Sequence, residues 1–164
     1  MPNPGDFTPT NLEFVINEDQ DETYAAIGGD VERYVAGASL NVGDVVYFSA
    51  AAGVVNKSTT IANYQTFAGV VVGGRQTGGR ALTMQNAVGV LAANVNELVL
   101  VMVRGKMWVV SGAAITAPAN VSADSTTAGR VLDGAGAVAG QIVGTVLQTV
   151  AGAAATTLMQ VGHR

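Results

Sequence analysis

The chain has 164 residues, of which 49% are apolar and 12% are charged, and 21 are glycine. This composition excludes disorder over most of the length, because disorder requires low hydropathy and high charge. The chain has no cysteine, which excludes disulfides, zinc–thiolate sites and thiol catalysis, and its one histidine is His163. The longest apolar run, 98–103, is too short to span a bilayer. The N-terminus lacks the basic and apolar regions of a secretion signal, so we expect a soluble protein.

Negative charge is concentrated at the N-terminus. Residues 1–32 contain eight acidic side chains and no Lys or Arg, whereas residues 33–164 contain eight basic and four acidic side chains. The acidic block also carries apolar residues, which a solvated tail usually lacks. These candidate partner-binding residues are Phe7, Leu12, Phe14, Val15, Ile16 and Tyr24. We expect residues 1–33 to form an extended acidic arm, either solvated or docked on a basic surface of a partner or a neighbouring copy.

The body, residues 34–164, is predicted to be all-β. Runs of β-branched and aromatic residues predict strands at 45–48, 67–72, 87–91, 98–103, 107–110, 141–147 and 156–161. Turns are expected at Gly43, Asp44, Gly69, Gly105 and Gly144, since glycine readily adopts a positive φ. The sequence Arg104-Gly105-Lys106 predicts a tight hairpin between two strands.

Self-comparison indicates an internal duplication with an offset near 75 residues. Four landmarks recur in order, pairing 37–40 with 112–115, 52–55 with 128–131, 69–72 with 144–147, and 84–85 with 159–160. Two copies are too few for a solenoid, and they fit two related β-units packed as a compact sandwich or barrel. We expect a first unit at 34–91, connecting strands at 92–111 and a second unit at 112–164.

No catalytic, cofactor or metal motif stands out. The stretch 73–80 fits a surface hairpin tip better than a phosphate cradle, because no helix is predicted to follow it. The acids at 18–22 lack the turn scaffold of a cation site. Trp108 is expected to anchor the core or an interface between subunits. We therefore predict no enzyme activity, no cofactor, no metal, no nucleic acid and no membrane. An enzyme or ligand binder would require a deep pocket with converging polar groups.

A pattern of strands and turns runs through Gly37–Tyr47, Phe67–Val70, Arg104–Val109, Gly112–Ile115 and Ile142–Val146. Over about residues 34–161 it resembles the small β-rich head decoration proteins (cement or capsid fibre proteins) of tailed bacteriophages. The resemblance does not include the acidic arm. It implies a virion protein, made in the host cytoplasm, that binds the major capsid protein on the outer surface of the head. Such a protein stabilises the shell by bridging capsid subunits, as a homotrimer or a dimer. The alternative is another structural β-protein of a virion or cell surface, such as a tail-tube, fibre or surface-layer subunit.

Overall fold

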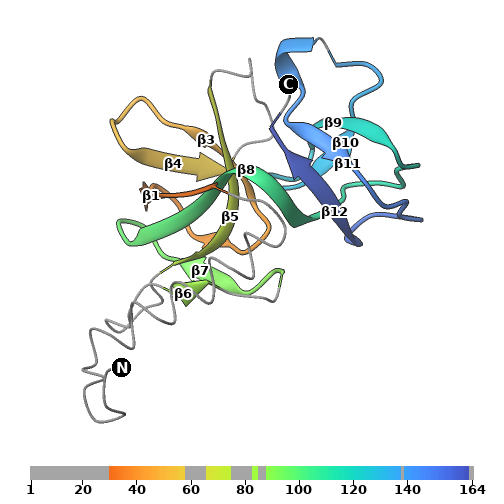
Figure 1. The fold of residues 1–164 in the computed structure, drawn as a ribbon. Coiled ribbons are helices and arrows are strands. Elements are labelled where there is room, and N and C mark those ends of the chain that lie inside the picture. The colour runs from red at the N-terminus through yellow and green to blue at the C-terminus, as the bar shows by residue number, and fades with distance from the viewer. Residues whose placement is uncertain (1–29, 58–65, 75–82, 85–87, 138, 163–164) are drawn as a thin grey trace, which may run out of the picture.

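The computed structural model describes residues 30–57, 66–74, 83–84, 88–137 and 139–162, and most of its regular structure is β (Figure 1). The all-β prediction is confirmed. The strands are β1 (Asp30–Ala36), β2 (Leu40–Asn41), β3 (Val45–Phe48), β4 (Val54–Lys57), β5 (Phe67–Gly74), β6 (Thr83–Met84), β7 (Leu91–Ala93), β8 (Leu98–Val110), β9 (Ala119–Ala123), β10 (Val131–Asp133), β11 (Gly144–Val146) and β12 (Thr156–Val161), with a short 3-10 helix at Ala139–Gln141. No helix in the described ranges is long and apolar enough to cross a membrane.

The predicted hairpin at Arg104-Gly105-Lys106 is wrong. Strand β8 runs unbroken through these residues, and Gly105 is a paired strand residue opposite Val161. The φ of Gly105 is +125°, so glycine here redirects the strand without reversing the chain. The predicted strands at 45–48 and 156–161 coincide with β3 and β12, and the one at 67–72 lies within β5.

The first half of the body closes into a five-stranded ring, here called the first barrel. Strand β1 pairs with β8 on one side and β4 on the other, β4 pairs with β3, β3 pairs with β5, and β5 returns to β8. All of these pairs are antiparallel except β1–β4. Buried valines such as Val46, Val55, Val99 and Val101 contribute to its core. Closure of the ring protects the strand edges that an open sheet would expose.

Strand β8 continues into a second ring, here called the second barrel. Its C-terminal part pairs with β12, and β11, β9 and β10 follow in that order. A parallel bridge between Val131 and Ser111 connects β10 back to the end of β8 and closes the ring. Figure 1 shows the two barrels joined by β8, which takes part in both.

The two barrels share strand order, strand direction and register. Glu32 pairs with Val101 in the first barrel, and Met107 pairs with Met159 in the second, at offsets of 75 and 58 residues. The parallel contact of Ala36 with Val55 recurs as the bridge of Ser111 with Val131, at offsets of 75 and 76. The repeated architecture is a property of the structure, whereas a duplication of the sequence stays a prediction.

The structure also locates the landmarks and boundaries taken from the sequence. The pairing of 84–85 with 159–160 does not fit, because β12 occupies the place that the first part of β8 holds in the first barrel. Residues 30–33 belong to β1 rather than to an arm, and β8 is shared by both barrels rather than being a separate connection. Residues 1–29 lie outside the described ranges.

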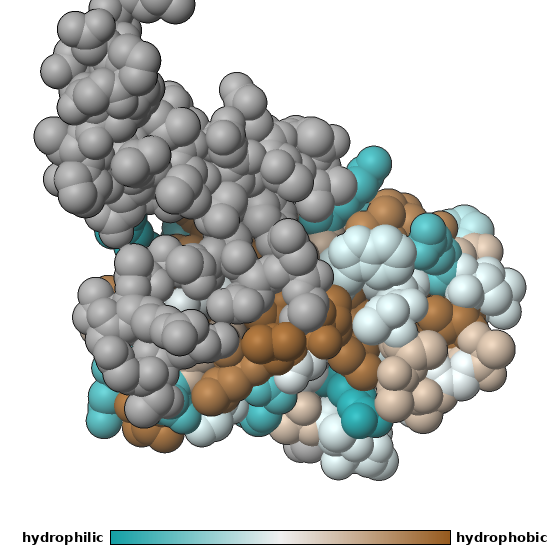
Figure 2. Space-filling view, turned by 90° about the horizontal axis from the view of Figure 1, so that it is seen from below, coloured by the Kyte–Doolittle hydropathy of each residue, from teal (hydrophilic) through white to brown (hydrophobic). Residues whose placement is uncertain are grey.

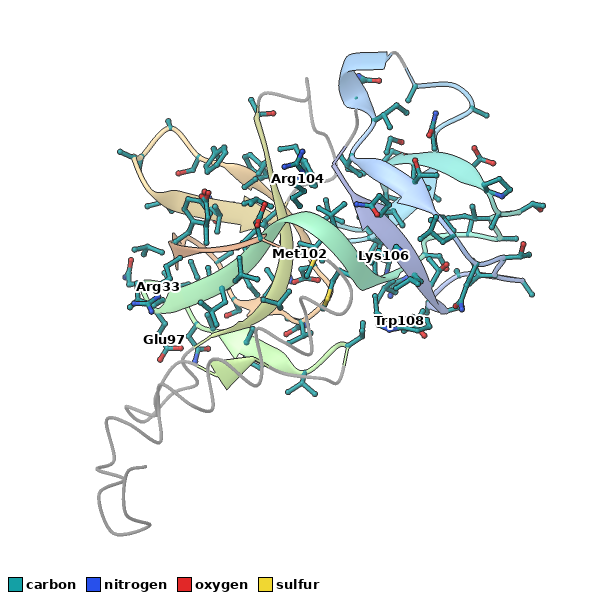
Figure 3. All side chains as sticks on the ribbon, in the orientation of Figure 1. Arg33, Glu97, Met102, Arg104, Lys106 and Trp108 are labelled. Atoms are coloured by element: carbon teal, nitrogen blue, oxygen red, sulfur yellow. The ribbon has the colours of Figure 1, made fainter. Side chains whose placement is uncertain are left out.

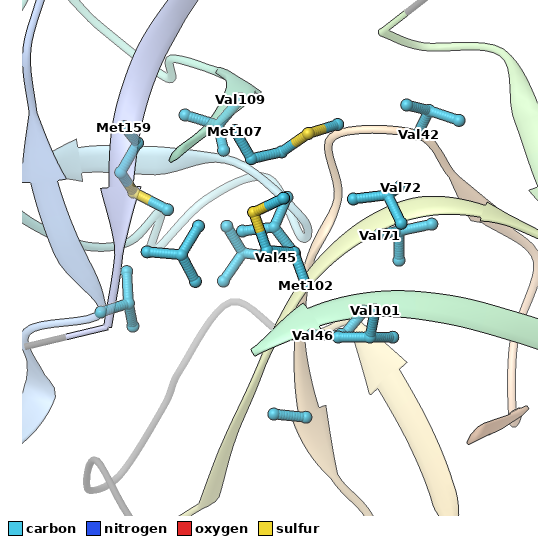
Figure 4. Close-up of a cluster of buried hydrophobic side chains, with 14 of the residues drawn as sticks. Val42, Val45, Val46, Val71, Val72, Val101, Met102, Met107, Val109 and Met159 are labelled. Carbon is cyan, nitrogen blue, oxygen red and sulfur yellow. The ribbon is translucent and has the colours of Figure 1, made fainter. Parts of the chain in front are cut away.

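Buried side chains fill the junction between the barrels. Met102 and Met107 on β8 and Met159 on β12 are 0%, 3% and 0% exposed, and Figure 4 shows them close to Val45. Methionine suits such an irregular gap because its side chain is long and flexible. A backbone hydrogen bond also crosses the junction, from the Val45 N–H to the Gly129 carbonyl at 2.9 Å. Packing and hydrogen bonding therefore fix one barrel against the other.

Candidate interaction surface

The residues singled out from the sequence separate into three groups in the structure. The six apolar arm residues, Phe7, Leu12, Phe14, Val15, Ile16 and Tyr24, lie outside the described residues, as does most of the stretch 73–80. Gly43 and Asp44 lie in a tight turn before β3, where the Asp44 N–H donates to the Asn41 carbonyl at 3.1 Å and Gly43 has a φ of +89°. Gly69, Gly105 and Gly144 are strand residues, so the turns expected at these three positions are wrong.

Gly69 and Gly144 hold equivalent places in the two barrels. A methyl group on Gly69 would overlap the Met102 carbonyl oxygen on β8, and one on Gly144 would overlap the Gln160 carbonyl oxygen on β12. In each barrel the glycine therefore lets two strand backbones approach closely where the ring closes. Sequence comparison matched these two glycines, but their role depends on a strand far away in the chain.

Asp44 links the turn before β3 to the second barrel. Its carboxylate accepts the Asn41 N–H at 2.8 Å and lies 3.5 Å from the Lys57 ammonium. A methyl group on Gly129 would come within 2.5 Å of Asp44 Oδ1, so the two residues are in close contact. Burial raises the pKa of Asp44 above its ordinary value, against the lowering effects of the Asn41 hydrogen bond and the Lys57 charge. Asp44 is thus a structural carboxylate at the junction.

Trp108 is not a core residue, because 39% of its side chain is exposed. It lies directly opposite Leu158 on β12, and paired residues of antiparallel strands point to the same face. Leu147, which is 39% exposed, lies opposite Leu158 on the other side, since its N–H donates to the Leu158 carbonyl at 2.7 Å. These three residues, Trp108, Leu158 and Leu147, form a row across the outside of the second barrel, here called the apolar row.

A polar row lies beside the apolar row, two residues further along each strand. It consists of Lys106, Gln160, Thr145 and Asn120, which are register partners on four neighbouring strands. The Thr145 hydroxyl donates to Asn120 Oδ1 at 3.0 Å, and Gln160 Nε2 donates to the Gly105 carbonyl at 3.1 Å. These hydrogen bonds order the polar side chains around the apolar row.

Positive charge borders these rows on β8. Arg104, Lys106 and Trp108 follow one another at alternate positions of the strand, as Figure 3 shows, and all three are exposed. Among the described residues the one ion pair is that of Lys57 with Asp44, so Arg104 and Lys106 have no carboxylate partner there. The outer face of β8 and β12 therefore combines an exposed tryptophan with two cations.

The apolar row was not predictable as a unit from the sequence. Leu147 and Leu158 belong to different strands, and only their pairing brings them next to Trp108. The alternating exposure along residues 105–110 was the one available local signal, and the expected hairpin concealed it. Figure 2 shows apolar surface gathered into bands and patches on the face seen from below. No group of His, Asp and Glu side chains suited to a metal ion occurs within the described ranges.

Comparisons with known proteins connect this fold to phage heads. Among solved structures, the chain is similar to the N base of head fibre gp8.5 of bacteriophage phi29, with 10% identity, a TM-score of 0.49, and coverage of 82% of this chain and 94% of that chain. It is also similar to a chain in the capsid of Myoviridae phage XM1, with 19% identity, a TM-score of 0.50, and coverage of 82% and 84%. The likeness to the XM1 chain shows a shared fold.

The sequence itself gives a family. No curated protein matches it. A family model described as structural cement protein (E217 gp24/Pam3 gp6) matches residues 8–162. The match includes most of the acidic arm, which the resemblance described above did not reach. Because the model spans all but the first seven and last two residues, the chain belongs to the structural cement protein family of phages.

Proposed function

We propose that this cement protein, which decorates and stabilises a phage capsid, binds the outer surface of the head and bridges neighbouring major capsid subunits. The family match over residues 8–162 carries the proposal. On this view the protein works by binding alone and has no substrate, cofactor or metal, and no nucleic-acid or membrane partner. A bridging protein restrains the shell because separating two capsid subunits would require breaking its contact with at least one of them.

The architecture supports such a bridging role. Two closed barrels that share one strand and a packed junction form a body that transmits load between contacts on its different faces. Exposed large apolar side chains occur on both barrels, including Phe48, Val95 and Leu98 on the first and Trp108 and Leu147 on the second. Contacts on two subunits are strengthened by effective concentration, so moderate individual affinities give firm attachment.

We further propose that the protein acts as a homo-oligomer, a trimer in preference to a dimer. Closed symmetric assemblies are the usual form of soluble oligomers, and a trimer would match three capsid subunits around a local threefold position. The low charge of the body and its exposed apolar groups favour association between copies. Light scattering at micromolar concentration would test this, and a 16.6 kDa species would contradict it.

The direct test is binding of the purified protein to shells that lack it, over a series of salt concentrations. We expect saturable binding that raises the temperature at which the shells break. Exposed ion pairs contribute only about 0–1 kcal/mol each, so the release rate should change little with salt while association slows. A many-fold faster release at high salt would show that ion pairs hold the complex. Binding to tails in place of shells, or a tail-like copy number in virions, would support the alternative structural role.

A further inference from the structure

We infer that the outer face of β8 and β12 receives the acidic arm of a second copy of this chain. The receiving surface is the apolar row with the cations Arg104 and Lys106, here called the arm site. The incoming piece is residues 13–22, here called the arm segment. The inference extends the proposed function and does not depend on it, because the contact forms between copies without a shell.

The arm site has the chemistry of a surface that binds an acidic, apolar peptide. Trp108 and Leu147 are each 39% exposed and, with the half-buried Leu158, offer a flat apolar strip. Aromatic and arginine side chains are the typical anchors of protein interfaces. Among the described residues Arg104 and Lys106 have no ion-pair partner. No acidic residue stands in the apolar row or the polar row, so an incoming carboxylate meets no like charge there.

The arm segment is complementary in both respects. It contains Phe14-Val15-Ile16, followed within six residues by Glu18, Asp19, Asp21 and Glu22, and it has no basic residue. Along an extended chain two residues span about 6.7 Å, so the apolar run and the first acids are separated by about 7–10 Å. Trp108 and Lys106 are also two residues apart on β8, and Arg104 is two further. The apolar and charged groups of the two partners thus have matching spacing.

The connection between arm and body favours a second copy over the same molecule. The arm joins the body at Asp30, which pairs with Arg104 in antiparallel register, so the chain before Asp30 leaves in the direction of Trp108. Ile16 lies 14 residues before Asp30, which is a reach of up to about 48 Å when extended. A domain of this size has a radius of gyration of about 14 Å, so that reach exceeds one molecular diameter. The acids at 18–22 repel one another and oppose a tight return onto the chain's own body.

Introduced cysteines test the inference directly, because the natural chain has none. The full-length variants Val15→Cys and Leu158→Cys are mixed under mild oxidation, and the Val15→Cys/Leu158→Cys double variant is oxidised separately. We expect a disulfide-linked heterodimer from the mixture and linked oligomers from the double variant. Ala51→Cys, on the exposed β3–β4 hairpin, replaces Leu158→Cys as the position control. An internal loop in the double variant, equal yields with Ala51→Cys, or no crosslink would each overturn the inference.

Charge reversal gives the second measurement, in variants that keep Leu158. Arg104→Glu with Lys106→Glu should weaken association of full-length copies about tenfold at low salt, as expected from reversing two exposed ion pairs. Reversing four arm acids to lysine in the same chain should restore it. Arg33→Glu is the matched control, because Arg33 is exposed on β1 at the position that Trp108 holds in the second barrel. An equal loss with Arg33→Glu, or no rescue by the lysine arm, would overturn the inference, while shell binding by the same variants reports separately on the proposed function.

Discussion

Replacing Gly69 by alanine adds one methyl group where β5 closes the first barrel against β8. The φ of Gly69 is +143°, and an alanine there would pay about 1–2 kcal/mol for this backbone conformation. The added carbon would overlap the Met102 carbonyl oxygen and come within 2.7 Å of Val101 Cγ1. Both atoms belong to a strand paired on two sides, so they have little room to move. Overpacking of this kind adds about 1–3 kcal/mol, which gives a total destabilisation of about 2–5 kcal/mol.

Gly53→Ala is the matched control for Gly69→Ala. Gly53 also has a positive φ, +73°, but no atom lies within 4 Å of the carbon that alanine would add. It therefore carries the backbone term alone. Urea unfolding of both variants, followed by far-UV circular dichroism, measures the difference in midpoint at an unchanged slope. If Gly69→Ala is no more destabilised than Gly53→Ala, the close approach of β5 and β8 does not exist as described.

Three titratable groups give further predictions. Asp124 is 1% exposed; burial alone would raise its pKa, but hydrogen bonds from neighbouring threonine groups lower it overall. The resulting stability is present at neutral pH and lost as pH falls through the folded-state pKa, so urea unfolding should show Asp124→Asn weaker by about 1.5–3 kcal/mol at pH 7 and closer to the natural protein at pH 3. For Asp44 the sign is opposite: burial raises its pKa despite Lys57, so its contribution to the unfolding free energy increases from pH 7 towards pH 5, and Asp44→Asn should lack this part of the pH dependence. Burial and the hydrogen bond to Glu32 raise the pKa of Tyr34 to about 12, so an ultraviolet titration should show one late phenol ionisation that Tyr34→Phe removes.

The sequence predicts the fold class and the doubling of the body from local signals. Strand β3 is a compact apolar run bounded by turn residues, so its limits are read directly. Strand β1 was missed because Glu32 and Arg33 interrupt its apolar pattern and both are exposed. The hairpin expected at Gly105 shows the limit of local reading. A glycine between two cations and two apolar runs suits a turn and a redirected strand equally well, and the pairing with β12 decides between them.

The candidate site depends even more on long-range pairing. Trp108 drew attention as the single tryptophan, but its exposure follows from β8 leaving one barrel and entering the other. After this passage the buried residues of β8 are those at 105, 107 and 109, and the side chains between them point outward. A periodic pattern with a change of phase is hard to recognise in a window of a few residues. The same passage places two cations beside the tryptophan.

Because β8 is a structural part of both barrels, we expect them to unfold in a single transition. The buried Met102 and Met107 and the hydrogen bond from Val45 to Gly129 link the barrels, so either barrel alone would expose apolar surface and unpaired backbone. Gly144→Ala, in the second barrel, should therefore lower the same melting transition as Gly69→Ala does in the first. Differential scanning calorimetry checks this, with equal calorimetric and van't Hoff enthalpies as the expected result. Each kcal/mol of destabilisation should move that transition by about 2–4 °C. A melt with two steps, of which each alanine variant moves only one, would mean that the barrels are independent domains and that β8 is merely a linker between them.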